Sequence, residues 1–427
     1  MNYKNLTPNE ISIKAQKLGE IRKVSSKMGV ALAMQHAVSM ILAISLKLSF
    51  ECFVCFLLCF FVFLFFYRLP RNYQSVALIF LSSVVFFCIF CMFFKKNRPN
   101  HILVSTTLTG IIAFSTMLVA VKFKKLILFL LSAFLVSVVL YNVLFVDFDI
   151  FTKQALRNAA NNKILLYVGL AISNMLSMVV LSSYLISKQT IKMGQIFCFK
   201  RLSSKALFYF TSMGLFVSFF ANMASSVLVN NLRAFGFFKK DTPDIPIEKN
   251  PAEILVFAIS VSLVPAIFEE IAFRGVVLGS LRRYGDYFAV LVSSLLFAMV
   301  HKDKYQVPFA FVLGLVLGSF LVETNSIFPS MLIHFFNNFF SCVLSLLKAY
   351  SKKSYEVFGD IYILIVLILG IISFFKILKL NPNFLLKDKN SPSFITTKER
   401  IQVFFFGGSA FLLLIIFIFL QLLFFLF

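Results

Sequence analysis

The run Phe268–Gly275, with the sequence FEEIAFRG, decides how this chain folds. It places two adjacent glutamates and an arginine inside a long apolar segment that extends from Ile254 to Leu281. A charged side chain at the middle of a bilayer costs roughly 2.5 kcal/mol or more, so three together need a specific role. We therefore expect this segment to be a membrane helix that carries polar chemistry.

Two strings that contain histidine follow in later apolar segments. Phe297–His301 (FAMVH) closes the next segment, and His334–Asn338 (HFFNN) lies inside a subsequent one. The three strings, EExxxR, FxxxH and HxxxN in this order, resemble the signature of the CPBP or Abi family of intramembrane proteases. That family includes CAAX prenyl protease 2. The resemblance covers residues 250–348.

Composition limits the class of protein. The 427 residues are 60% hydrophobic and their mean hydropathy is +0.91, which excludes a soluble globular protein. The apolar runs are about 18–24 residues long without two-residue alternation, which favours helices over a β-barrel. We expect an all-α, polytopic transmembrane helical bundle of about 11–13 spans in the cell membrane, with a C-terminal core like that of the CAAX proteases.

Apolar runs and polar interruptions predict the organisation. The expected parts are a polar basic segment, an N-terminal transmembrane region, a catalytic core and C-terminal transmembrane helices, at residues 1–27, 28–229, 251–348 and 361–427. The candidate spans are 28–46, 48–67, 76–94, 101–123, 125–146, 163–186, 207–229, 252–282, 287–301, 307–324, 327–347, 361–378 and 404–425. Leu380–Arg400 is expected to be a loop before the last span.

The charge balance indicates a partner. The net charge is +23, from 41 basic and 18 acidic residues. Most basic residues fall between apolar runs, as in Lys95–Arg98 and Lys200–Arg201, where they suit anionic lipid head groups. No compact basic domain is present that would bind nucleic acid, so we expect no nucleic-acid partner.

The spacing within FEEIAFRG separates the two glutamates. Glu270 and Arg274 are four residues apart and share a helical face, so they can form an ion pair. Glu269 lies about 100° around the helix from Glu270 and is left for chemistry. The alternative is that both carboxylates surround Arg274 in one structural ion cluster.

The turn predicted at Arg282–Asp286 brings a histidine to the level of Glu269. Glu269 precedes this turn and His301 follows it, each by about 20 Å of helix, so both could share one water molecule as a general base. The charged residues directly after His301 suggest a water-filled cavity that enters from residues 302–306. Phe297 lies one turn before His301 and can pack against its ring. An interfacial histidine at a helix end is the alternative for His301.

His334 and Asn338 share a helical face, and both can donate hydrogen bonds to an oxyanion. Asn337 is expected to point elsewhere. Hydrogen bonding between membrane helices is the alternative role for the pair. Gly314 and Gly318 form a GxxxG string, which favours close helix packing in the core.

The family resemblance implies that Glu269 and His301 activate water while His334 and Asn338 hold the oxyanion. The chain is then an intramembrane endopeptidase of the CAAX prenyl endopeptidase type, a family often labelled metalloendopeptidase, acting on a membrane protein or on a lipidated or small peptide. A non-catalytic scaffold that retains the fold and a proton-coupled transporter are the alternatives. Zinc could bind Glu269, His301 and His334, but the chain has no HExxH string, so we expect no metal to be required.

Overall fold

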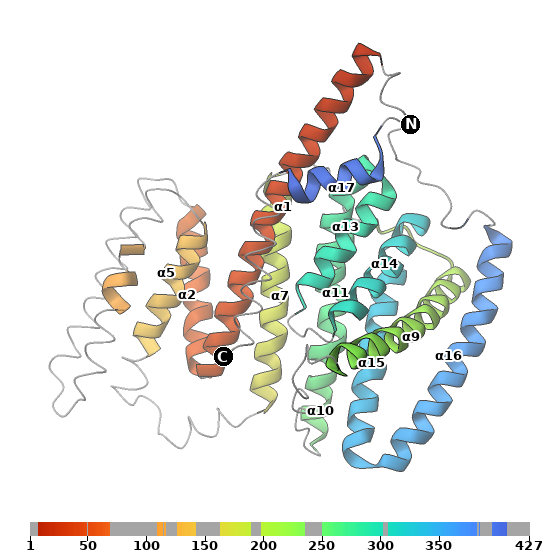
Figure 1. Ribbon diagram of the computed structural model, residues 1–427. Helices are drawn as coiled ribbons and strands as arrows, with labels where there is room; N and C mark the ends of the chain where they lie inside the picture. The colour runs from red at the N-terminus through yellow and green to blue at the C-terminus, as the bar shows by residue number, and fades with distance from the viewer. Residues whose placement is uncertain are drawn as a thin grey trace. The chain divides into compact units, whose positions relative to one another are not determined.

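The computed structural model of the chain is all-helical over the residues that it describes (Figure 1). No strand occurs among these residues; the sole β-type pairing recorded there is an isolated bridge between Phe199 and Ser326. The described residues are 7–48, 50–68, 109–113, 115–116, 126–141, 163–188, 198–234, 250–301, 306–381, 384 and 395–407.

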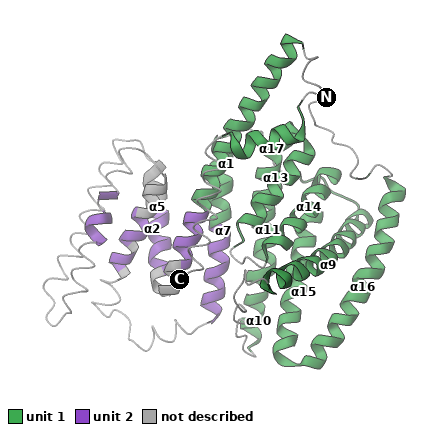
Figure 2. Cartoon of the chain, viewed as in Figure 1, with its two compact units in different colours: residues 1–35, 177–427 green, residues 36–176 purple. Residues whose placement is uncertain are grey.

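The chain divides into two compact units (Figure 2). The smaller unit comprises residues 36–176, and in it helix α2 packs against helix α5. The larger unit joins residues 1–35 to residues 177–427 and contains all the predicted site residues. The helices that belong wholly or partly to the smaller unit are α1 (Pro8–Leu48), α2 (Phe50–Arg68), α5 (Leu126–Tyr141) and α7 (Lys163–Lys188).

The larger unit is built around one long interrupted helical run. The run consists of α10 (Pro251–Ala258), η3 (Ile259–Leu263), α11 (Val264–Glu270), η4 (Ile271–Leu278), α12 (Gly279–Leu281) and η5 (Arg282–Tyr284). Segments η3 and η4 are π-helical and flank α11, and π-helical insertions in α-helices are frequent at functional sites. The other helices are α9 (Ser204–Ala234), α13 (Asp286–Met299), α14 (Val307–Thr324), α15 (Phe328–Tyr350), α16 (Lys352–Leu380) and α17 (Thr397–Phe406).

Local sequence explains where the long run begins and ends. The side chain of Asn250 accepts a hydrogen bond from the backbone N–H of Ala252 at 3.0 Å and caps α10. At the other end, Gly285 has a φ of 128°, which a glycine adopts without strain, and the chain reverses there into α13. Arg282 and Asp286 form an ion pair across this reversal at 2.9 Å. The predicted tight turn is confirmed.

Helices α13 and α14 approach each other closely at the GxxxG string. A Cβ atom on Gly314 would lie 2.9 Å from the Ser294 Cβ and 3.0 Å from its Cα. A Cβ atom on Gly318 would lie 3.2 Å from side-chain atoms of Leu278 and Val290. The two glycines therefore permit the close helix packing that their spacing predicts.

Six helices among the described residues are long and apolar enough to cross a membrane. They are α7, α9, Pro251–Tyr284, α14, α15 and α16, and they match six of the predicted spans. The predicted span at 287–301 is the shorter apolar helix Asp286–Met299. Those at 28–46, 48–67 and 125–146 fall mainly on α1, α2 and α5, while 76–94, most of 101–123 and most of 404–425 lie outside the described residues. The chain is a multi-pass integral membrane protein.

Two polar stretches are more helical than the sequence suggests. Helix α1 continues without interruption from Pro8, so most of the polar segment 1–27 is helical. Helix α17 begins at Thr397, inside the stretch predicted to be a loop, because Thr396 and Glu399 form a capping box. Local capping chemistry therefore extends regular structure into both stretches.

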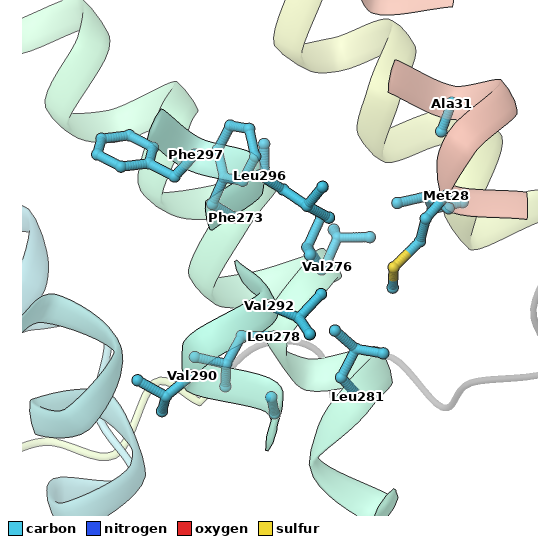
Figure 3. Close-up of a cluster of buried hydrophobic side chains, with 14 of the residues drawn as sticks. Met28, Ala31, Phe273, Val276, Leu278, Leu281, Val290, Val292, Leu296 and Phe297 are labelled. Carbon is cyan, nitrogen blue, oxygen red and sulfur yellow. The ribbon is translucent and has the colours of Figure 1, made fainter. Parts of the chain in front are cut away.

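The first part of α1 belongs to the core of the larger unit. Figure 3 shows Met28 pointing from α1 toward Val276 and Leu281 of the long run, and all three residues lie in one buried cluster. Phe273 and Phe297, which flank the charged residues of the site, belong to the same cluster. The polar site is therefore built directly into the apolar core.

Candidate active site

Four elements of the larger unit supply the predicted site residues. Helix α11 ends with Glu269 and Glu270, and segment η4 carries Arg274. Phe297 lies in the last turn of α13, and His301 follows that helix by two residues. His334 and Asn338 lie on α15. Helix α15 contacts both η3 and α11, which brings its polar face to the long run.

Glu270 and Arg274 form a buried ion pair, as the sequence predicts. The Arg274 Nη1 atom donates to the Glu270 Oε1 atom at 3.0 Å. The two side chains are 0% and 1% exposed, so neither charge can be satisfied by bulk water. Arg274 also donates from Nη2 to the backbone oxygen of Gly314 at 3.5 Å, a position that carries no side chain to block the approach. The direct ion pair of Arg274 involves Glu270, not Glu269.

His334 contacts both glutamates, an arrangement that the sequence did not predict. Its Nδ1 atom lies 2.9 Å from the Glu270 Oε1 atom, the same oxygen that pairs with Arg274. Its Nε2 atom lies 3.9 Å from the Glu269 Oε2 atom. One carboxylate thus holds the His334 ring, and the ring's other nitrogen faces the second carboxylate.

The partner of each histidine sets the position of its proton. The Glu270 carboxylate is paired with Arg274 and accepts hydrogen bonds, so Nδ1 of His334 carries the proton. A neutral His334 then has its lone pair on Nε2, and that nitrogen can donate only when the ring is an imidazolium. An oxyanion role for His334 therefore requires the protonated ring.

His301 is held in the same tautomer. Its Nδ1 atom lies 2.9 Å from the backbone oxygen of Phe297, which can only accept, so a neutral ring carries its lone pair on Nε2. Glu269, His334 and Arg274 lie close enough for their charges to act on this ring. Residues 302–305, the side from which a cavity is predicted, lie outside the described residues.

Phe297 packs against several members of the site at once. Its ring lies edge-on to His301 and His334, with centroids 4.8 Å and 5.8 Å away. The Arg274 guanidinium carbon lies 4.2 Å from the same ring centroid, a cation–π contact. The prediction that Phe297 packs the His301 ring is confirmed, and the same ring also contacts His334.

Asn338 makes its described contacts away from His334. Its Nδ2 atom donates to the backbone oxygen of Val261, in η3, at 3.1 Å. Its Oδ1 atom accepts from the Nδ2 atom of Asn337 at 3.4 Å. The expectation that Asn337 points elsewhere is therefore wrong: adjacent residues on a helix can meet when their side chains bend toward each other.

The donor atoms of the described residues do not form a zinc site. No group of three His, Cys, Asp or Glu residues within the described ranges gathers closely enough to hold a metal ion. Glu269 and His334 approach each other to 3.9 Å, but His301 does not join them as a third ligand. This arrangement does not fit a catalytic zinc, which needs three protein ligands.

Comparison with known proteins gives a family match in this part of the chain. The family model described as type II CAAX prenyl endopeptidase Rce1-like matches residues 251–340. The membrane-embedded CAAX protease MroQ of Staphylococcus aureus (strain USA300) is 31% identical over 118 residues. That alignment covers 26% of this chain and 48% of the relative, so the chain spans about half the length of the curated protein that it matches. No solved structure matches significantly.

The matched residues coincide with the elements that carry the site. Residues 251–340 begin at the first residue of α10 and extend two residues beyond Asn338. They contain the interrupted helical run, the buried ion pair and both histidines described above. Residues 251–340 of this multi-pass membrane protein therefore match the type II CAAX prenyl endopeptidase Rce1-like family.

Proposed function

We propose that the chain is an intramembrane endopeptidase that hydrolyses a peptide bond in a membrane protein or in a lipidated or small peptide. The observation that carries the proposal is the buried contact of His334 with two glutamates inside the residues that match the CAAX endopeptidase family. The His334 ring nitrogens lie 2.9 Å from a carboxylate oxygen of Glu270 and 3.9 Å from one of Glu269. Two carboxylates and an arginine are costly in a membrane helix, and hydrolytic chemistry gives them a use.

In the proposed reaction, Glu269 and the Nε2 atom of His301 bind the attacking water. Glu269 takes one proton as the water oxygen bonds to the scissile carbonyl carbon, and the carbonyl oxygen becomes an oxyanion. Asn338, together with His334 in its protonated form, donates hydrogen bonds to that oxyanion. Glu269 then returns the proton to the amine as the C–N bond breaks.

The contacts of Glu270, Glu269 and Phe297 support a different role for each side chain. Glu270 is committed to Arg274 and His334 through one oxygen, which suits it to holding the site together. Glu269 lies with its Oε2 atom 3.9 Å from the Nε2 atom of His334 and makes no ion pair with Arg274, which suits it to proton transfer. Phe297 packs against both histidine rings, which suits it to holding them in place.

Substitution of Glu269 tests the proposal. Glu269→Gln keeps the size of the side chain and removes the base, so hydrolysis of a peptide library by purified protein should fall by at least about 10²-fold. The matched control is Glu253→Gln, which alters a glutamate in the first turn of α10 and should leave hydrolysis unchanged. Activity of Glu269→Gln within a few-fold of wild type would contradict the assignment. Wild-type protein that cleaves no member of the library would favour a scaffold.

We also propose that one end of the larger unit contacts anionic lipid head groups. Phe199 and Phe328 are exposed and lie against each other, with ring centroids 6.0 Å apart. Three exposed basic residues lie near these rings: Lys200, Arg201 and Arg283. Lys200 and Arg201 directly follow Phe199, whose backbone pairs with Ser326. Arg283 follows Arg282, which contacts the Cys198 sulfur. Lys200→Gln with Arg201→Gln should weaken the retention of phosphatidylglycerol in native mass spectrometry.

A further inference from the structure

Pro265 interrupts the backbone hydrogen bonding of the long helical run. In an α-helix the backbone oxygen of Val261 accepts from the N–H of the residue four positions later, and that residue is Pro265. Proline has no N–H, so this regular donor is missing. The π-helical segment η3 ends at Leu263, directly before α11, in which Pro265 occupies the first turn. The backbone oxygen of Val261 therefore has no donor at the position that an α-helix would use.

Asn338 supplies the missing donor. Its Nδ2 atom donates to the backbone oxygen of Val261 at 3.1 Å, although the two residues are 77 positions apart. A backbone oxygen can only accept, so the contact fixes which end of the amide faces Val261. The Oδ1 atom accepts from Asn337, which agrees with this orientation. The amide group of Asn338 is held at both ends.

The same contact sets the register of α15 against the long run. His334 meets Glu270, and Asn338, one turn later on α15, meets Val261, which precedes Glu270 by nine residues. The two helices therefore run antiparallel, with polar contacts about one helical turn apart on α15.

The side-chain amide of Asn338 has two N–H groups, and one of them donates to Val261. The other N–H is the one that can serve a substrate.

We propose that Pro265 is a positioning residue of the active site: by withholding its N–H it leaves the Val261 carbonyl to orient Asn338, whose second N–H then donates to the oxyanion. This inference rests on the proposed endopeptidase function. Asn338 then makes a structural contact with the Val261 oxygen and a chemical contact with the oxyanion, and the second contact depends on the first. Pro265 itself touches no reacting atom.

Pro265→Ala tests the proposal because it restores an N–H that competes with Asn338 for the Val261 carbonyl. Loss of an oxyanion donor costs about 10²–10³ in kcat, so a misplaced donor should lower kcat by about ten-fold or more. The KM should stay within about two-fold, because the side chain does not contact substrate in the ground state. The thermal midpoint should be unchanged or higher, because alanine is the better helix former.

The matched control is Pro308→Ala. Pro308 is also half-buried and lies in the first turn of α14, where a missing N–H leaves no helical bond unmade. Its kcat should equal that of wild type. In addition, the side-chain amide resonance of Asn338, identified by its absence in Asn338→Ala, should shift in Pro265→Ala and not in Pro308→Ala.

Two results would overturn the inference. An unchanged kcat in Pro265→Ala would show that the Val261 contact does not orient a catalytic donor. A loss of kcat accompanied by a lower thermal midpoint and an unmoved Asn338 resonance would show a purely structural proline. Failure of the proposed function has a different signature, because Glu269→Gln would then equal wild type whatever the result with Pro265.

Discussion

A single carboxylate oxygen, Oε1 of Glu270, connects the guanidinium of Arg274 to the imidazole of His334. It accepts from Arg274 at 3.0 Å and from His334 at 2.9 Å, and all three side chains are buried. Removal of Glu270 therefore strands a cation and also releases an imidazole. A residue with two buried partners is expected to affect stability and activity by separate routes.

The two routes can be separated by a double substitution. Glu270→Ala should cost about 3–5 kcal/mol of stability because it leaves Arg274 buried without its ion-pair partner. Glu270→Ala combined with Arg274→Ala should recover much of that loss, since no charge is then stranded. The double variant should nevertheless remain inactive, because His334 has lost the acceptor that sets its tautomer. Thermal midpoints and hydrolysis rates of both variants provide the measurement.

An exposed pair of the same spacing serves as the control for this experiment. Lys352 and Glu356 are 3.8 Å apart and their side chains are 89% and 57% exposed. Glu356→Ala should leave the thermal midpoint unchanged, because water replaces the lost partner. If Glu270→Ala melts like Glu356→Ala, the buried pair does not stabilise the fold.

Metal dependence is a second question at the scale of single residues. His301 does not join Glu269 and His334 in a three-ligand set, so we expect hydrolysis to proceed without a bound metal. Purified active protein should contain less than stoichiometric zinc, and prolonged 1,10-phenanthroline treatment should leave its rate unchanged. Stoichiometric zinc, or activity that is lost and then restored by added zinc, would contradict this expectation.

At the scale of elements, the site depends on how closely α13 and α14 approach. Gly314→Ala would place a Cβ atom 3.0 Å from the Ser294 Cα, and backbone cannot move aside as a side chain can. The separation of the helices that follows should also draw the Gly314 oxygen away from Arg274. We expect a loss of about 1–3 kcal/mol of stability, measured as a lower thermal midpoint.

Gly359→Ala on α16 is the matched control, because the nearest atom to its added Cβ is 3.9 Å away. Alanine is favoured over glycine in a helix by roughly 0.5–1 kcal/mol, so this variant should be as stable as wild type or more so. Equal thermal midpoints for the two variants would show that α13 and α14 adjust without cost.

Contacts within one helix could be predicted from the sequence, but contacts between helices could not. The Glu270–Arg274 pair and the turn at Arg282–Asp286 follow from spacings of four residues, which helical geometry converts directly into contacts. The contact of His334 with Glu270 joins residues 64 positions apart. It depends on the register of α15 against the long run, and no local spacing encodes that register. The π-helical segments were likewise not predicted, because apolar periodicity does not distinguish them from α-helix.

At the scale of the whole molecule, the unit that carries the site is assembled from separate parts of the chain. Ser25 donates to the backbone oxygen of Phe404, residues 379 positions apart. Lys14 and Glu399 form an ion pair at 2.8 Å. Composition predicted a polar segment at 1–27, and it could not show that the apolar face of this segment enters the core of the site-bearing unit.

Met28 provides a test of that assembly. It is 1% exposed and belongs to the cluster that contains Val276 and Leu281. Met28→Ala should cost about 2–5 kcal/mol and lower the thermal midpoint of the hydrolytic activity. Met40→Ala is the control on the same helix, since Met40 is 40% exposed and should tolerate truncation. Equal midpoints would indicate that residues 1–35 do not support the site.

The division of the larger unit into residues 1–35 and 177–427 has a consequence for the order of events during synthesis. At roughly 5–20 residues per second, Met28 is made on the order of ten seconds or more before Val276 exists to contact it. During that interval the ribosome produces residues 36–176, which form the smaller compact unit. The first helix must therefore stay available for this contact, and the site-bearing unit can form only after its earliest and latest segments have met.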